Sequence, residues 1–248
     1  MVKTMGNSLV VKNISFAYKN KDKSVSPVFD NLSFNVEAGE VIGLIGESGC
    51  GKTTLLRILS GALDPSQGNI VLGDEDVTNI MTRDRDVAYV FQRPVLYPHM
   101  SIYQNVCSAL SYYGLTRDEV DYKAKGYLKK YKMVKYINYK PRHLSDGQKQ
   151  MVCLMRAFIR EPALLLLDEP FFNLDIKTKD ELADSCFKEI KEHQVTTIFV
   201  THNIEDAMRY SNKIMVIEKG EIKDFGEPFA MLKEPKSNLL KDYIKTNS

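Results

Sequence analysis

The stretch that decides the fold lies in the first quarter of the chain and reads Gly46-Glu47-Ser48-Gly49-Cys50-Gly51-Lys52-Thr53-Thr54. Its part from Gly46 to Thr53 matches the pattern GxxxxGK[ST] in full. The apolar run at residues 41–45 predicts a buried strand before it. Residues 52–60 carry leucine and isoleucine at helical spacing, and Gly61 follows as a typical helix end. The segment therefore predicts a strand, a glycine-rich loop and a helix, the arrangement of a phosphate-binding loop.

Each part of this loop suits a phosphate. The glycines let backbone N–H groups converge on phosphate oxygens, and the helix N-terminus adds the positive end of its dipole. Lys52 is predicted to reach the β- and γ-phosphates, and Thr53 to offer its hydroxyl to Mg²⁺. We expect all of residues 46–54 to bind ATP with Mg²⁺. The alternatives are a glycine turn without a ligand and a dinucleotide fingerprint, although Thr54 stands where the third glycine of that fingerprint would be.

Two carboxylates end a second apolar run, Leu164-Leu165-Leu166-Leu167-Asp168-Glu169. The carboxyl end of a parallel strand opens onto the ligand edge of an α/β sheet. Asp168 is predicted to hold Mg²⁺ through its water shell, and Glu169 to polarise the water that attacks the γ-phosphate. His202 follows another β-rich run and is predicted to contact the γ-phosphate at the same edge. With Lys52, these give the predicted catalytic residues Glu169, His202 and Lys52; an acidic turn and a surface histidine are the alternatives.

Apolar patterning predicts the remaining organisation. Strands are expected at residues 9–18, 32–36, 163–168, 195–201 and 213–218, and helices at 177–193 and 204–210, with a helical stretch over 101–135. Pro141 and Ser145 mark a break and a new helix start. Alternating strands and helices favour an α/β fold whose mostly parallel sheet is flanked by helices.

Composition narrows the class of protein. The 248 residues include 34 Lys plus Arg and 32 Asp plus Glu, a net charge of +2 that gives no support to binding of nucleic acid through overall basicity. The longest strictly apolar run, residues 163–167, is far shorter than the roughly 20 residues of a membrane span. The start MVKTMGNSLV has no hydrophobic signal region, so we expect a cytosolic chain. Four scattered cysteines without metal-site spacing are expected to be reduced thiols.

A third motif, Leu144-Ser145-Asp146-Gly147-Gln148, gives the whole pattern a recognisable order. The chain resembles the ATP-binding cassette (ABC) ATPase family, whose motif at this place is LSGGQ. The resemblance implies that this helix N-terminus faces the γ-phosphate held by a partner subunit, with Ser145, Gly147 and Gln148 contacting the nucleotide. Asp146 replaces the common glycine, and we expect its side chain to point away from the phosphate.

The resemblance assigns further residues in the family's order. Tyr18 takes the place of the adenine-stacking aromatic, with a strand aromatic as the alternative. Gln92 takes that of the glutamine-loop residue and binds Mg²⁺ with Thr53 and Asp168. Residues 173–175, Asn-Leu-Asp, take that of the D-loop, and His202 is the switch histidine.

The implied fold is a P-loop NTPase with an N-terminal antiparallel β subdomain. Residues 1–248 would form a single ABC ATPase domain, in which 1–92 and 145–248 are the catalytic body and 93–144 a helical subdomain.

Residues 82–92 and 96–101 are similar to import ATPases of the carbohydrate and related solute class. That similarity implies a homodimer or a dimer with a paralogous ATPase, a transmembrane permease, an extracytoplasmic solute-binding protein and a place at the cytoplasmic face of the membrane. Sugar-class members commonly carry a C-terminal regulatory domain, which we do not expect in a chain ending at Ser248; importers of polyamines, iron, phosphonates or sulfonates share much of the motif. The alternatives are a soluble ABC ATPase acting on nucleic acid or ribosomes and a subunit serving an exporter. No nucleic-acid partner is expected, since the chain has neither tandem cassettes nor a strongly basic extension.

Two adjacent segments differ sharply in charge. Residues 94–116 contain no Asp, Glu, Lys or Arg, and residues 117–142 contain nine basic and three acidic side chains. The uncharged segment is predicted either to dock a helix of the permease, around residues 97–103, or to fill a helical core. The basic segment is either a solvated helix face or a surface for anionic lipid headgroups.

Overall fold

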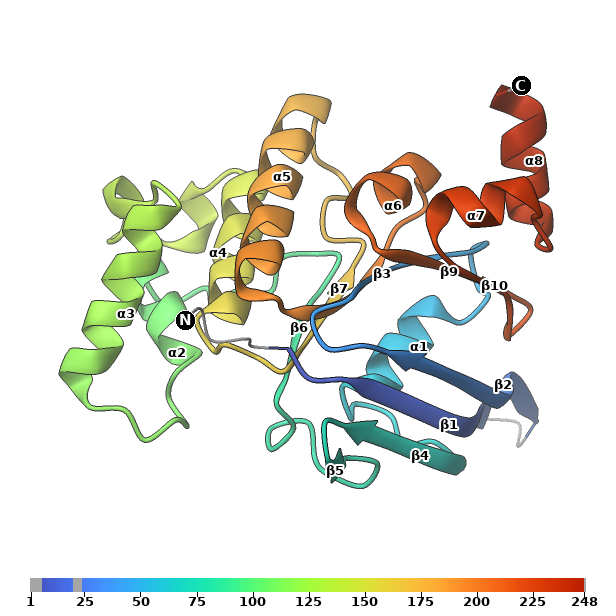
Figure 1. The fold of residues 1–248 in the computed structure, drawn as a ribbon. Helices are drawn as coiled ribbons and strands as arrows, with labels where there is room; N and C mark the ends of the chain where they lie inside the picture. The colour runs from blue at the N-terminus through green and yellow to red at the C-terminus, as the bar shows by residue number, and fades with distance from the viewer. Residues whose placement is uncertain (1–5, 20–23, 248) are drawn as a thin grey trace.

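The computed structural model describes residues 6–19 and 24–247. Residues 1–5, part of the N-terminal stretch in which we expect no signal peptide, lie outside the described residues. Within those ranges the larger sheet has the strand order β10-β9-β3-β8-β7-β6 (Figure 1). All neighbours in it pair in parallel except β10, which is antiparallel to β9. Its strands are β3 (Val41–Ile45), β6 (Val87–Val90), β7 (Leu164–Asp168), β8 (Thr196–Val200), β9 (Lys213–Glu218) and β10 (Glu221–Gly226). The predicted mostly parallel sheet is confirmed.

A second, antiparallel sheet is built from the N-terminal part of the chain. Its order is β2-β1-β4-β5, with β1 (Leu9–Lys19), β2 (Val25–Val36), β4 (Gln67–Leu72) and β5 (Glu75–Asp76). In β1 the side chains of Leu9 and Val11 are buried while Val10 between them is partly exposed, as period-two alternation dictates for a sheet with one covered face. The expected antiparallel β subdomain is thus present, with β2 longer than the run predicted at residues 32–36.

Helix α1 (Lys52–Leu59) lies between the two sheets (Figure 1). Its apolar residues share one core with Ile14 of the antiparallel sheet and Leu44 of the parallel sheet. Gly61, at φ +74°, ends the helix as predicted. The buried guanidinium of Arg85 then donates hydrogen bonds to carbonyls around that end, those of Ile58, Leu59, Thr78 and Ile80. Because charged donors satisfy these carbonyls, the orientation of α1, and of the loop before it, is fixed from its far end.

The opposite face of the parallel sheet is covered by α4 (Asp146–Phe158) and α5 (Ile176–His193). Strand β7 shows why its run is entirely apolar: Leu164 and Leu166 join the α1 core, whereas Leu165 and Leu167 join the α4–α5 core. Near β9, residues of α6 (Ile204–Tyr210), α7 (Pro228–Lys233) and α8 (Asn238–Asn247) form a smaller core with Ile214 and Val216.

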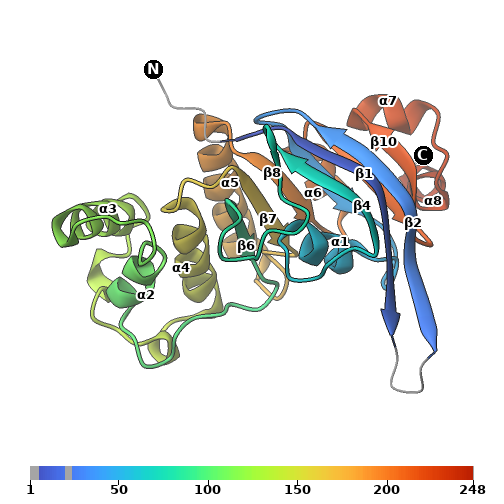
Figure 2. The same cartoon turned by 90° about the horizontal axis from the view of Figure 1, so that it is seen from below.

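A helical region lies at the end of the molecule opposite the antiparallel sheet (Figures 1 and 2). It contains α2 (Ile102–Ser108) and α3 (Arg117–Lys130), whose buried side chains pack on Val152 and Met155 of α4. The helical stretch predicted over residues 101–135 is wrong in its middle, because residues 109–116 leave the helix and include Gly114 at φ +65°. Helix α4 also contributes Phe158 to the core under the parallel sheet, so it connects the helical region to that sheet.

Three of the nine basic side chains in the basic segment form ion pairs within the chain. Lys123 contacts Glu161 at 2.6 Å, Lys125 contacts Asp121 at 2.8 Å, and Lys130 forms an ion pair with the buried carboxylate of Glu189 on α5. At these three positions the ion pairs favour the solvated-face alternative over the lipid surface.

Among the described residues, none of the helices combines the length and apolar character that a membrane crossing requires. All four cysteines lie in the described part of the chain and are free thiols, as predicted.

Candidate nucleotide site

The predicted residues meet at one edge of the parallel sheet. The phosphate loop follows β3, Asp168 ends β7 with Glu169 directly after it, and His202 follows β8. Since β8 pairs in parallel with both β3 and β7, the carboxyl ends of all three strands open at the same edge. The topology therefore brings together three motifs that are spread over residues 46–202.

The phosphate loop is shaped by glycine where the chain enters α1. Gly51 caps the helix at φ +109°, and a Cβ at this position would lie 2.7 Å from the ring of Phe29. Both the backbone angle and the space exclude a side chain. The Nζ of Lys52 donates hydrogen bonds to the carbonyls of Gly46 at 2.7 Å and Glu47 at 2.9 Å, which hold its ammonium over the loop. The lysine is therefore placed where phosphate oxygens would compete for it.

A hydroxyl and a carboxylate lie together at the predicted Mg²⁺ site. The Thr53 hydroxyl donates to Asp168 Oδ1 at 3.1 Å, and Tyr89 donates to Asp168 Oδ2 at 2.8 Å. Burial and the charge of Asp168 raise the pKa of Tyr89, so its phenol remains a donor at neutral pH. The hard oxygen donors of Thr53 and Asp168 fit Mg²⁺. Tyr89 was missed by the sequence reasoning, because only the pairing of β6 with β7 places it there.

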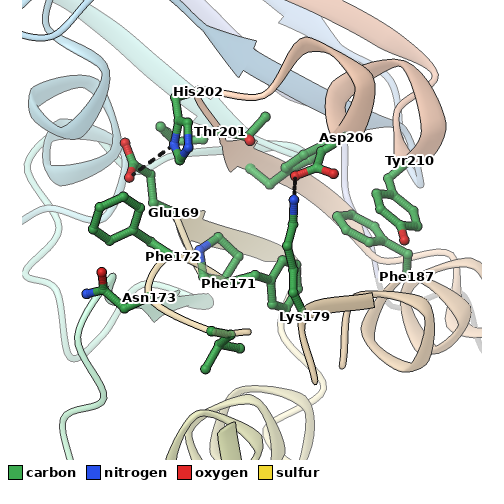
Figure 3. A pocket seen from close by; sticks show the side chains of 14 residues that line it. Glu169, Phe171, Phe172, Asn173, Lys179, Phe187, Thr201, His202, Asp206 and Tyr210 are labelled. Carbon is green, nitrogen blue, oxygen red and sulfur yellow. Dashed lines mark ion pairs between the residues drawn. The ribbon is translucent and has the colours of Figure 1, made fainter. Parts of the chain in front are cut away.

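Glu169 is held by both of its predicted neighbours. Gln92 Nε2 donates to Glu169 Oε2 at 3.0 Å, and His202 Nδ1 lies 3.6 Å from the same oxygen (Figure 3). Glu169 has φ +44°, a left-handed conformation that costs a non-glycine residue roughly 1–2 kcal/mol. Strain of this kind, sustained by surrounding contacts, is typical of functional residues. The carboxylate predicted as the base is thus aimed by an amide and an imidazole.

A cavity of about 240 Å³ opens beside this carboxylate (Figure 3). Its walls include Glu169 and His202 at one end and an ion pair between Lys179 and Asp206, 2.6 Å apart, at the other. Five aromatic rings also line it, those of Phe171, Phe172, Phe187, Phe199 and Tyr210. Water reaching Glu169 from this side would meet a largely apolar wall.

Tyr18 lies next to the phosphate loop, although the two are far apart in sequence. Its hydroxyl is 3.1 Å from the Thr54 hydroxyl, and its ring packs edge-on against Phe16 at a centroid distance of 4.9 Å. This places a half-exposed aromatic beside α1, a position compatible with both readings of Tyr18.

The N-terminus of α4 is organised locally. Ser145 caps the helix and forms a capping box with Gln148, whose amide also donates to the Tyr136 hydroxyl at 2.8 Å. Gly147 packs so tightly on α5 that a Cβ would lie 2.6 Å from Thr178 Cγ2. Among the described residues, the hydrogen bonds of Ser145 and Gln148 join these local partners and not the phosphate loop of the same chain.

Asp146 pairs with Lys149 at 2.8 Å along the exposed side of α4. The residue that departs from the family motif is therefore balanced by a lysine within its own helix turn.

The D-loop segment leads into α5. Asn173 has φ +66°, and Asp175 caps α5 by accepting a hydrogen bond from the Thr178 backbone N–H at 3.0 Å. Hydrogen bonds from Thr178 lower the pKa of Asp175. The turn after Glu169 is thus tied to the start of α5.

A family model described as ABC transporter matches residues 29–172, more than half of the chain. The chain belongs to the ABC transporter family. The predicted resemblance and the P-loop fold are both confirmed by this match and by the solved structures below.

Curated relatives of this ABC chain include a spermidine/putrescine import ATP-binding protein PotA from Protochlamydia amoebophila, 36% identical over 95% of this chain and 63% of the relative. A trehalose/maltose import ATP-binding protein MalK from Thermococcus litoralis is 37% identical over 86% of this chain and 59% of the relative. The ABC chain thus spans about three fifths of these relatives' length.

Solved structures share the fold over nearly the whole chain. The structure of cbiO1 from Clostridium perfringens, part of the ABC transporter complex cbiONQ, superposes with a TM-score of 0.81 at 27% identity, covering 97% of this chain and 94% of that one. A dimeric ATP-binding cassette in a post-hydrolysis state bound to ADP and Pi gives 0.78 at 27% identity, covering 89% and 98%.

Proposed function

We propose that this chain is the ATP-hydrolysing subunit of an ABC importer. The observation that carries the proposal is the arrangement around Glu169, which Gln92 and His202 contact beside the Thr53–Asp168 pair. A binding module needs the phosphate loop alone, whereas a positioned carboxylate, amide and imidazole are what attack by water on a γ-phosphate requires. Family membership and the import ATP-binding names of the relatives support the proposal.

The chemistry follows from the chain's own residues. The loop amides and Lys52 bind the β- and γ-phosphates, and Thr53 and Asp168 would hold Mg²⁺, which neutralises charge on the phosphate oxygens. Glu169 orients the attacking water and accepts its proton as the bond to the γ-phosphorus forms. His202, whose Nδ1 lies 3.6 Å from the same carboxylate, donates toward the γ-phosphate oxygens as the bond to ADP breaks.

A second copy or a paralogue completes the site in this proposal. The N-terminus of α4 presents Ser145, Gly147 and Gln148 with a helix dipole suited to a phosphate, yet the hydrogen bonds of Ser145 and Gln148 are local. Two chains related by twofold symmetry would each offer this terminus to the other's phosphate loop. The dimeric cassette with ADP and Pi supports this arrangement.

The permease is proposed to dock beside the glutamine loop, at the cytoplasmic face of the membrane. In the uncharged segment, Ile102, Val106 and Leu110 are buried in the helical core, whereas Val95 and Tyr97 are exposed. The exposed part is continuous with Gln92, so a permease helix seated there would sense the position of Gln92. Tyr97→Asp should abolish co-purification with the permease and solute uptake. The matched variant Tyr122→Asp, on the exposed face of α3, should leave both unchanged, and equal behaviour of the two variants would contradict this docking site.

The solute is proposed to be a sugar, delivered by an extracytoplasmic binding protein. The similarity of residues 82–92 to import ATPases of the carbohydrate class supports this choice, as does the relative named for trehalose and maltose import. The relative named for spermidine and putrescine import makes a polyamine the competing candidate. Uptake of labelled maltose and labelled spermidine by cells with and without the chain distinguishes them.

The enzymatic proposal is tested by Glu169→Gln. The amide keeps the size and the hydrogen-bond acceptor but cannot take a proton, so turnover should fall by about 100-fold or more while the affinity for ATP is retained. The measurements are phosphate release and equilibrium binding of a fluorescent ATP analogue. Turnover at the parent rate would refute the assignment of Glu169 as the base.

A further inference from the structure

The imidazole of His202 is weakly restrained for a group with so specific a task. Its side chain is 64% exposed, on the turn between β8 and α6. Among the described residues, two groups hold it: the Glu169 carboxylate at 3.6 Å and the ring of Phe172, in an edge-to-face contact with centroids 5.6 Å apart and planes at 83° (Figure 3). Without the ring of Phe172, the exposed imidazole would keep only its contact with Glu169 and could exchange among the staggered rotamers. The contact with Phe172 therefore restricts the orientation of the imidazole.

Phe172 is tied to the base as well as to the histidine. Its backbone N–H donates to the Glu169 carbonyl at 3.1 Å, which closes a turn between the two residues. The strained φ of Glu169 and the positive φ of Asn173 fix the backbone on either side of this turn. The backbone of Phe172 is consequently held close to that of Glu169.

Phe172 lies at two neighbouring cavities, together with Pro170, Asn173 and Leu174. One is the cavity that contains His202 and Glu169, and the other is a second cavity of about 310 Å³ bordered by Gln92, Lys149 and Gln150. Phe172 lines both of them. The turn that carries Phe172 therefore borders both the cavity with His202 and the cavity with Gln92.

We propose that Phe172 is a positioning residue that keeps the His202 imidazole directed at Glu169, so that histidine and base meet the γ-phosphate as one preformed unit. The kinetic consequence rests on the function proposed above; the contact itself does not. Edge-to-face pairs of aromatic rings have the geometry and strength for this task.

The contact is tested first in the free chain by NMR of the histidine rings. The protein has four histidines, and His202→Ala identifies the signals of His202. Phe172→Leu removes the ring but keeps an apolar side chain, so the His202 ring C–H signals should shift and the other three should not. Phe229→Leu, at an exposed position on α7, is the matched control and should move none. Unchanged His202 signals in Phe172→Leu would overturn the proposal.

Kinetics then tests the positioning role. Phe172→Leu should lower kcat by about fivefold, the effect of losing one edge-to-face contact, with the KM for ATP changed by less than about twofold. Phe172→Tyr should restore most of kcat. In the His202→Ala background, Phe172→Leu should have no further effect, because the two residues act through one another.

Three outcomes would overturn the proposal: an equal fivefold loss in the His202→Ala background, a loss seen mainly in KM, or a loss of ATP-dependent dimer formation when Phe172→Leu is combined with Glu169→Gln. Each would place the ring's effect at another surface. If the parent chain hydrolyses no ATP, the proposed function fails, and the NMR experiment still decides whether Phe172 orders His202.

Discussion

The edge of the parallel sheet and the N-terminus of α4 carry the two halves of the predicted site, and they differ in how they are satisfied. At the sheet edge, residues from different strands contact one another: Thr53 with Asp168, and Gln92 and His202 with Glu169. At α4, Ser145 and Gln148 are satisfied by one another and by Tyr136. The first region is assembled by the fold of one chain. In the second, the helix terminus proposed to bind phosphate has only local partners, and none of them belongs to the phosphate loop of the same chain. This difference is the physical reason to expect a second chain.

The largest effect is expected where the sheet edge depends on one hydroxyl. Thr53→Val removes both the hydrogen bond to Asp168 and the proposed ligand of Mg²⁺, so turnover should fall by about 100-fold. Tyr89→Phe removes the other hydrogen bond to Asp168 and no metal ligand, and should lower turnover by no more than about threefold. Phosphate release measured over a range of Mg²⁺ concentrations checks both. Equal losses would mean that the hydrogen bonds to Asp168, and not the metal ligand, decide activity.

A smaller effect is expected from tight packing at α4. Gly147→Ala introduces a Cβ 2.6 Å from Thr178 Cγ2 and should destabilise the chain by about 1–3 kcal/mol. Thr178→Ser removes that methyl group and should restore the stability. The matched control is Gly126→Ala in α3, where nothing lies within 4 Å, so the better helix former should stabilise by up to about 1 kcal/mol. Chemical unfolding measures all of these.

A destabilised Gly147→Ala that Thr178→Ser does not rescue would contradict the packing explanation. Rescue would show that the added methyl group displaces α4. A loss of activity in Gly147→Ala would then report this displacement as well as any lost contact with the nucleotide.

The smallest effect is expected at Asp146. Because its ion pair with Lys149 is largely solvent-exposed, Asp146→Asn should change the free energy of unfolding by less than about 0.5 kcal/mol. The double-mutant cycle with Lys149→Met gives the pair's own contribution. A coupling well above that size would show that the pair fixes the start of α4 and is more than a surface contact.

Local patterns were sufficient for the parts of the site that are local. The loop from Gly46 to Thr53 and the run ending at Glu169 each carry their own strand, turn and chemistry in consecutive residues, and both could be predicted. Ser145 was predictable as a helix start because a capping residue precedes the helix it caps.

Contacts that depend on strand order could not be predicted in the same way. Tyr89 reaches Asp168 only because β6 pairs with β7, and Arg85 reaches the end of α1 only because the chain returns to it after the antiparallel sheet. No sequence motif singles out Phe172, and its contact with His202 requires β7 and β8 to be neighbours. The helical stretch over residues 101–135 was too long because an apolar, uncharged composition does not distinguish the loop at 109–116 from the helices beside it.

The central claim, that the N-terminus of α4 completes the nucleotide site of a second chain, is tested most directly by ATP-dependent dimer formation. Glu169→Gln with MgATP should elute with twice the monomer mass in size exclusion with light scattering. Adding Ser145→Arg should leave ATP affinity intact and keep the protein monomeric, because the bulky cation occupies the terminus that meets the partner's phosphate.

The matched control is Thr116→Arg, which removes an equivalent capping box from α3 in the same helical region and should still dimerise. A Ser145→Arg, Glu169→Gln protein that forms the dimer as readily as Glu169→Gln alone would contradict the account.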